Sequence, residues 1–209
     1  MNGQPIPPQH GKPVRIIVPG HVGVRNVKWL SKIVLSNEES QGPWQRGMSY
    51  KGFSPSTKSL EGIDVEAIPS LQEQPVQSAI LCPNNEHNMT HTVEAGDIIP
   101  VKGYAYSGGG RGIVRVDVSI DGGETWKTAE LTEGKHQPIN RAWAWTFWEV
   151  DVEIPPKLVG KHMEIISKAT DASYNVQPDT VAGIWNLRGI NCNAWHRVVV
   201  EVVPSQEEE

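Results

Sequence analysis

Arg111 is the residue whose surroundings most favour the binding of an anion. It follows Ser107-Gly108-Gly109-Gly110, and three successive glycines predict a loop, because they offer no side chains to pack and cost backbone entropy in a strand. A guanidinium binds oxyanions through two parallel hydrogen bonds, and neighbouring glycine N–H groups can assist it. From the residues alone, however, a solvated charge on an ordinary connecting loop is the stronger interpretation.

A second group of basic residues lies near the N-terminus. His10 and Arg15 precede Arg25 and Lys28 by a few residues, on two adjacent predicted loops. Cationic donors grouped in this way suit a phosphate. Surface charge on a loop-rich segment is again the simpler interpretation.

Evidence for a metal site is weaker. Two histidines, His87 and His91, have a ligand-like separation beside Cys82 and Glu86, but no paired cysteines accompany them, so a polar loop is favoured over a zinc site. The two cysteines of the chain are too few for a disulfide framework, and we expect Cys82 and Cys192 to be buried free thiols.

A regular strand is predicted directly after Arg111. Residues 113–120 alternate with a period of two, which is typical of a half-buried strand. The alternation places Val114, Val116, Val118 and Ile120 on one face. Asp121-Gly122-Gly123 follows and predicts a tight hairpin, because these residues tolerate positive φ.

The sequence after residue 75 has the pattern of an Ig-like β-sandwich, with about seven short β-runs separated by turn residues. The predicted strands are 76–81, 98–106, 113–120, 125–131, 143–154, 162–169 and 195–203. No long amphipathic helix and no internal repeat is evident.

The first fifty residues predict only part of a domain. They contain two strand-like runs, 14–18 and 27–35, which cannot bury their own apolar faces in water. We therefore expect this piece to belong to a longer protein, with Met1 as an internal methionine. Residues 51–75 are rich in Pro, Ser, Gln and Glu and predict a linker.

Composition excludes several classes of protein. The 209 residues are 38% hydrophobic and 21% charged, which is typical of a soluble globular protein. A formal net charge of −5 argues against a nucleic-acid partner. No apolar run approaches the length of a membrane span, and the N-terminus resembles no signal peptide, so no membrane partner is expected.

Long motifs of this sequence resemble the sulfite oxidase family of molybdenum enzymes. MNGQPIPPQHGKPVRIIVPGHVGVRNVKWL is similar to the end of the family's molybdopterin domain. Further motifs resemble the dimerisation domain of the same family: YKGFSPS, PVQSAI, KGYAYSGGGRGIVRVDVSIDGGETW, AWAWTFW, NVQPDTVAGIWNLRG and NAWHRV. The resemblance implies a mainly β chain. Residues 1–50 would be the C-terminal piece of an α+β molybdopterin domain, and residues 51–205 an Ig-like (E-set) dimerisation domain beginning with the linker.

The same resemblance implies roles for individual residues. The HGxPVR motif contacts the molybdopterin through its histidine and arginine, here His10 and Arg15. The stretch Asn26, Val27 and Lys28, which ends with the lysine of the KW pair, is expected to contact it as well. The arginine of SGGGR, here Arg111, would help to bind the anionic substrate, which favours the oxyanion interpretation over the solvated charge.

The activity implied by the resemblance is the oxidation of sulfite to sulfate at molybdenum. Family members are homodimers that pass electrons to a haem domain and cytochrome c in animals, or to oxygen in plants. They reside in the mitochondrial intermembrane space or in the peroxisome, respectively. The C-terminal Glu-Glu-Glu is unlike a peroxisomal address, which favours the mitochondrion.

The molybdenum-ligating cysteine of the family lies upstream of the motifs matched here. Neither Cys82 nor Cys192 stands at its position, so we predict no metal ligand in this sequence and no catalysis by the isolated chain. Two alternatives stay open: the corresponding part of an assimilatory nitrate reductase, and a non-enzymatic Ig-like interaction module.

Overall fold

The computed structural model describes residues 1–84 and 90–205 and consists of two compact units. The first unit comprises Met1–Gln74 and Ala182–Cys192, and the second comprises Pro75–Val181 and Asn193–Glu209.

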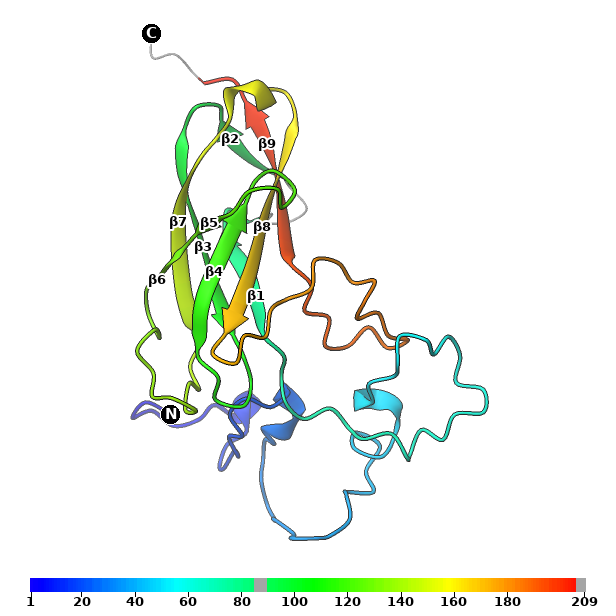
Figure 1. The fold of residues 1–209 in the computed structure, drawn as a ribbon. Coiled ribbons are helices and arrows are strands. Elements are labelled where there is room, and N and C mark those ends of the chain that lie inside the picture. The colour runs from blue at the N-terminus through cyan, green and yellow to red at the C-terminus, as the bar shows by residue number, and fades with distance from the viewer. Residues whose placement is uncertain (85–89, 206–209) are drawn as a thin grey trace. The chain divides into compact units, whose positions relative to one another are not determined.

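The second unit is a β-sandwich of two sheets (Figure 1). One sheet has the order β1-β3-β7-β6 in the described residues, and its neighbouring strands are antiparallel. Its strands are β1 (Gln77–Cys82), β3 (Ile98–Tyr106), β7 (Thr146–Glu153) and β6 (Glu130–Leu131).

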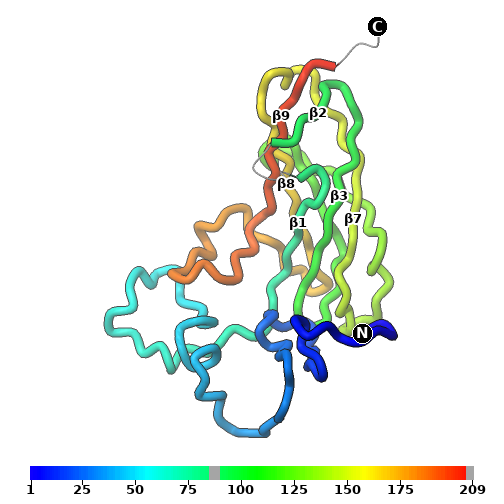
Figure 2. Tube along the Cα trace, turned by 180° about the vertical axis from the view of Figure 1, so that it is seen from behind, coloured from blue at the N-terminus to red at the C-terminus, as the bar shows by residue number. Residues whose placement is uncertain are grey.

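The other sheet has the order β2-β9-β8-β4-β5. It is antiparallel except for the β2–β9 pair, which is parallel. Figure 2 shows the sandwich from behind, with β2 beside β9. The strands are β2 (His91–Glu94), β9 (His196–Val203), β8 (His162–Asp171), β4 (Ile113–Ser119) and β5 (Lys127–Thr128), and the short 3₁₀ helix η4 (Pro156–Leu158) precedes β8.

The predicted sandwich is therefore confirmed, with two differences in its strands. The predicted strand 125–131 is in fact two short strands, β5 and β6, which pair in different sheets. The chain crosses from one sheet to the other between β5 and β6, so residues 125–131 do not form one strand with a continuous alternation of buried and exposed side chains. Strand β2 was not predicted, because its four residues are too few to establish a period.

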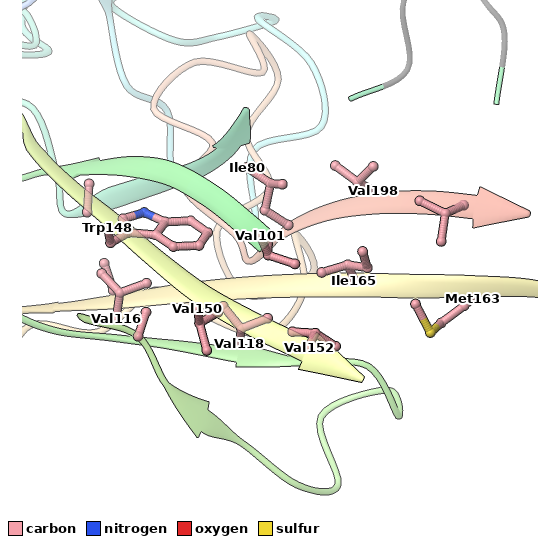
Figure 3. Packing of buried hydrophobic residues seen from close by; sticks show 14 of the residues in the cluster. Ile80, Val101, Val116, Val118, Trp148, Val150, Val152, Met163, Ile165 and Val198 are labelled. Atoms are coloured by element: carbon pink, nitrogen blue, oxygen red, sulfur yellow. The ribbon is translucent and has the colours of Figure 1, made fainter. Parts of the chain in front are cut away.

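Trp148 forms the centre of the core between the two sheets. This residue is 1% exposed, and its ring lies among Val101, Ile80 and Val116, as Figure 3 shows. Directly opposite Trp148 on β3 is Gly103. A Cβ at Gly103 would lie 2.3 Å from the Trp148 ring, so the absence of a side chain there makes room for the indole.

A β-bulge interrupts β4 and corrects the predicted alternation. Ile113 pairs with Asp171 and Arg115 with Thr170, so Val114 is an extra residue in this strand. Ile113 is consequently buried in the core, and Val114 is 52% exposed. From Val116 onward the predicted inward face is correct.

A buried amide fastens the segment after β8 to the sandwich. Gln177 is 3% exposed, and its Oε1 accepts hydrogen bonds from Ser78 Oγ (2.7 Å) and the Ala169 N–H (2.9 Å). Its Nε2 donates to the carbonyls of Asn193 (3.0 Å) and Ala194 (3.1 Å). Every polar atom of this amide thus has a partner, and the NVQPDTV motif has a structural role in this unit.

His196 links the two sheets through a bond that requires a neutral imidazole. Its Nδ1 accepts a hydrogen bond from the Ile80 N–H (3.1 Å), which joins β9 to β1. Desolvation by burial lowers the pKa of His196 from its usual value, and protonation of Nδ1 would remove the acceptor.

We expect the second unit to lose stability as the pH falls through the ordinary histidine range. Because the unfolded chain binds a proton at His196 more readily than the folded one, the free energy of unfolding falls with decreasing pH, by at most about 1.4 kcal/mol per pH unit for this one proton. Urea unfolding of the wild type and of His196→Gln between pH 8 and 5 measures this effect. The variant should show a flatter pH dependence, and identical slopes would contradict the assignment.

The first unit contains little regular structure. Its helices in the described residues are the 3₁₀ turns η1 (Pro8–His10), η2 (Gly23–Arg25) and η3 (Met48–Tyr50). The predicted strands 14–18 and 27–35 are wrong: these segments share single backbone bonds, Ile16 N–H to the Val27 carbonyl (3.1 Å) and Leu30 N–H to the Val14 carbonyl (2.9 Å), without forming a ladder. Pro13 and Pro19 flank segment 14–18. Because proline has no backbone N–H, neither can donate a hydrogen bond to a strand ladder.

Arg25 stabilises the interior of the first unit. Its guanidinium donates to Gln45 Oε1 and to the Leu71 carbonyl (2.9 Å), and lies over the Tyr50 ring at 5.6 Å from the ring centre. Burial lowers the pKa of Arg25, against the raising influence of Tyr50 and Glu39.

Two further features concern the surface. Within residues 1–84 and 90–205, no helix has the length and apolar character needed to cross a lipid bilayer.

Cys82 and Cys192 are free, as predicted, but both are exposed, which contradicts their predicted burial. Cys82 lies at the end of β1, where the sheet gives way to a loop, so its side chain has no layer to cover it.

Candidate anion-binding sites

Arg111 lies between the glycine loop and the start of β4, and its side chain is fixed by two groups of the second unit. Its Nε donates to Asp171 Oδ2 (3.0 Å) and to Ser107 Oγ (3.2 Å). The side chain is 23% exposed, so the guanidinium is partly shielded from water without being enclosed. An arginine so held keeps its charge and has a defined orientation, as the binding of an oxyanion requires.

The backbone on each side of Arg111 is fixed as well. The Gly110 carbonyl accepts from the Ala142 N–H (3.1 Å), and the Gly112 carbonyl accepts from the Ala172 N–H (2.8 Å). Gly110 has φ of +73°, and a Cβ there would lie 2.3 Å from the Asn140 carbonyl oxygen. The loop therefore needs glycine at position 110 both for its conformation and for the close approach of the chain.

Asp171 is the buried partner of Arg111. Its side chain is fully buried, and both oxygens accept several hydrogen bonds. Oδ2 accepts from Ser107 Oγ (2.8 Å) and Asn175 Nδ2 (2.9 Å), while Oδ1 accepts from the N–H groups of Ser173 (2.8 Å) and Asn175 (3.0 Å). Burial alone would raise the pKa of Asp171, but the bonds from Asn175, Ser107 and Ser173 lower it below its usual value, so the carboxylate is ionised at neutral pH.

The basic residues near the N-terminus form a separate cluster within the first unit. Arg15 donates from Nε to the Asn26 carbonyl (3.2 Å) and from Nη1 to the His10 carbonyl (3.4 Å). The Val18 N–H donates to Asn26 Oδ1 (2.8 Å). The structure thus brings His10, Arg15 and Asn26 together.

Lys28 joins the same cluster because Gly11 allows the chain to approach closely. A Cβ at Gly11 would lie 2.8 Å from Lys28 Cβ. Lys28 Nζ donates to the Gln9 carbonyl (2.8 Å). Val27, between Asn26 and Lys28, has its carbonyl engaged by the Ile16 N–H.

A pocket of about 240 Å³ adjoins this cluster. It is lined by Met1, Ile6, His10, Arg15 and Ile17, and its surface is almost entirely apolar. Such a pocket suits the organic part of a ligand, while the side chains of His10, Arg15 and Lys28 are of the kind that bind a phosphate. Arg25 is not part of this cluster, because its guanidinium is bonded to Gln45 and Leu71 instead.

No metal site accompanies these residues in the part of the chain that the structure describes. Residues 1–84 and 90–205 contain no group of three or more histidine, cysteine, aspartate or glutamate side chains arranged to hold an ion. Of the weak metal candidates, Glu86 and His87 lie outside the described residues.

The residues that hold Arg111 were not predicted from the sequence. Asp171 and Ser107 are separated by 64 positions, and no local pattern links them. The local signal nearby is the turn-forming run Asp171-Ala172-Ser173, two residues after the end of the predicted strand 162–169. It predicts a loop and does not identify a partner.

Comparison with known proteins gives two family matches and a set of relatives. The family model described as "Mo-co oxidoreductase dimerisation domain" matches residues 68–203, and the one described as "Oxidoreductase molybdopterin binding domain" matches residues 1–44. Mitochondrial sulfite oxidase of Rattus norvegicus is 55% identical over 204 residues, which are 98% of this chain and 36% of the rat protein.

Two other relatives extend the comparison. Sulfite oxidase of Gallus gallus is 51% identical over 94% of this chain and 40% of its own length. Nitrate reductase of Hordeum vulgare is 36% identical over 96% of this chain and 23% of its own length. The chain spans less than half the length of each of these relatives.

Proposed function

This chain belongs to the Mo-co oxidoreductase dimerisation domain family, and from that premise we propose that it is the C-terminal part of a molybdenum enzyme that oxidises sulfite to sulfate. One observation carries the choice of substrate. Identity is 55% to the rat sulfite oxidase but 36% to the barley nitrate reductase, over nearly the same share of this chain.

The first unit would contribute part of the molybdopterin site. The apolar pocket beside His10 and Arg15 would receive the organic part of such a cofactor, and these two side chains with Lys28 would contact its phosphate. Asn26 and Val27 would complete the contact surface, while their carbonyls hold the two loops together. Oxygen-atom transfer and two-electron chemistry would be supplied by the bound molybdenum cofactor.

Arg111 would bind the substrate. Sulfite and sulfate are anions whose oxygens match the geometry of a guanidinium. The bonds of Arg111 Nε to Asp171 and Ser107 support this role, since they hold the charge in one place before the substrate arrives. An oriented donor need not reorganise during the reaction, and such preorganisation favours catalysis.

Exposed apolar side chains in the first unit support its membership of a larger domain. Ile17, Ile33, Val34 and Leu35 are each more than half exposed. Such a run is ordinarily covered by other parts of a protein.

Assembly and location are part of the same proposal. The match to a dimerisation domain supports a homodimer, and the mitochondrial names of the mammalian relatives support a mitochondrial location. An animal-type enzyme would reside in the intermembrane space and pass electrons through a haem domain to cytochrome c.

The experiment that tests the proposed function is a steady-state assay of the full-length enzyme with sulfite and with nitrate. We expect oxidation of sulfite with an artificial electron acceptor such as ferricyanide. Reduction of nitrate by a reduced dye should be undetectable under matched conditions. The opposite preference would establish the second candidate, an assimilatory nitrate reductase, to which the similarity of the barley enzyme points.

A further inference from the structure

We propose that Asp171 is a positioning residue, which fixes the Arg111 guanidinium in the orientation that receives the substrate anion. This inference rests on the proposed function, because it takes a sulfur oxyanion to be the ligand of Arg111. It adds a residue to the substrate site that lies 60 positions from Arg111 in the sequence.

The contacts of Asp171 make it suited to this role. The carboxylate is fully buried at the end of β8, and the N–H groups of Ser173 and Asn175 hold Oδ1. Oδ2 faces Arg111 Nε and Ser107 Oγ. Since bonds on both oxygens prevent rotation of the carboxylate, it presents one acceptor to the arginine in a fixed direction.

Attachment through Nε determines how the rest of the guanidinium lies. The group is planar, and four of its five N–H donors are on the two terminal nitrogens, beyond the Nε anchor. Fixing Nε to a rigid acceptor therefore limits the directions in which the terminal donors can point. Ser107 contributes to the same anchor, because it accepts from Arg111 Nε and donates to Asp171.

A simpler role for Asp171, partial neutralisation of Arg111, predicts the opposite result on mutation. Asp171→Asn removes a negative charge beside the arginine, so electrostatics alone would strengthen the binding of an anion and lower KM. If Asp171 positions Arg111, the carboxamide cannot satisfy all the same donors, because it has one acceptor oxygen. The guanidinium then loses its fixed orientation, and KM rises.

The test is the steady-state kinetics of sulfite oxidation by Asp171→Asn in the full-length enzyme. We expect KM to rise about 10- to 100-fold, with a smaller loss in kcat, since a misplacement of about 1 Å can cost about 100-fold. Ser107→Ala, which removes one anchor without changing the charge, should raise KM several-fold. In an Arg111→Lys background, which lacks Nε in the fork, Asp171→Asn should change KM little further.

The matched control is Asp117→Asn. Asp117 is also a buried carboxylate beside an arginine, because its Oδ1 accepts from Arg115 Nε (2.8 Å), but Arg115 has no place in the proposed site. This variant should leave KM for sulfite unchanged, and urea unfolding of both variants separates an effect on folding from one on binding.

Each outcome decides between the proposals. An unchanged or lowered KM in Asp171→Asn, or an equal effect in the Arg111→Lys background, overturns the positioning role while sulfite oxidation by the wild type leaves the proposed function intact. Should Asp171→Asn fail to fold, an unchanged KM in Ser107→Ala overturns the role. A wild-type enzyme that does not oxidise sulfite would overturn the proposed function, and this inference with it.

Discussion

Replacement of Arg111 by methionine in the full-length enzyme is expected to lower kcat/KM for sulfite by about 30- to 4,000-fold. Truncating one member of a charged, hydrogen-bonded pair at a binding site costs about 2–5 kcal/mol, and each 1.4 kcal/mol corresponds to a factor of ten. Methionine keeps much of the length and apolar stem of arginine but has no charge or N–H donor. Steady-state kinetics at saturating electron acceptor measures the effect.

Two further variants separate specific binding from general charge. Arg111→Lys keeps the charge without the planar fork, so its activity should lie between those of the wild type and Arg111→Met. Arg115→Met removes an arginine from the same strand, whose side chain is 57% exposed and paired with Asp117, and kcat/KM should not change. A loss of activity in Arg115→Met as large as that in Arg111→Met would contradict a specific role for Arg111.

The second large effect concerns stability: Gly103→Ala is expected to destabilise the second unit by about 3 kcal/mol, near the upper end of typical overpacking costs. The added Cβ would lie 2.1 Å from the Ala79 carbonyl oxygen and 2.3 Å from Trp148 Cζ2. Neither neighbour can yield easily, since one is backbone of β1 and the other is the buried centre of the core. Thermal unfolding should show Tm lowered by about 10 °C for a protein of this size.

Gly112→Ala is the matched control for this measurement. A Cβ at Gly112 would meet Ala142 Cβ at 3.7 Å, an ordinary contact, and the residue does not have positive φ. Glycine-to-alanine changes at compatible positions stabilise proteins by about 0.4–1 kcal/mol through the unfolded state. Equal losses of stability in the two variants would mean that the cost at Gly103 does not arise from its packing against Trp148.

Strands with a long alternating pattern were predicted best from the sequence. Strand β3 has the predicted bounds, and β8 and β9 differ from the predicted runs by one or two residues. In each of them alternate side chains enter the core, so the pattern of the sequence and the burial agree. The predictions failed where burial is set by contacts distant in sequence, as in residues 125–131 and in the first unit.

The candidate site residues also divide into those that could be predicted from the sequence and those that could not. Arg111, His10 and Arg15 stand out by residue type and by motif, and their roles remain predictions. The partners that orient Arg111 are Asp171, at the end of β8, and Ser107, directly after β3, and which strand ends meet there depends on how the strands are arranged. A single sequence does not specify that arrangement, so Asp171 could be found only in the folded chain.

The extra residue at Val114 has a consequence for how genes of this kind can diverge. The bulge places Ile113 opposite Asp171. This register of β4 against β8 also brings Arg111, two residues earlier, within hydrogen-bond distance of the Asp171 carboxylate. Deleting the codon for Val114 would leave Ile113 directly before Arg115, so Ile113 would still face the core and pair with Asp171 in a regular ladder. Homologous genes should therefore tolerate a change or a loss of residue 114 far more readily than the loss of a paired residue of this strand, which reverses the alternation of the side chains before it.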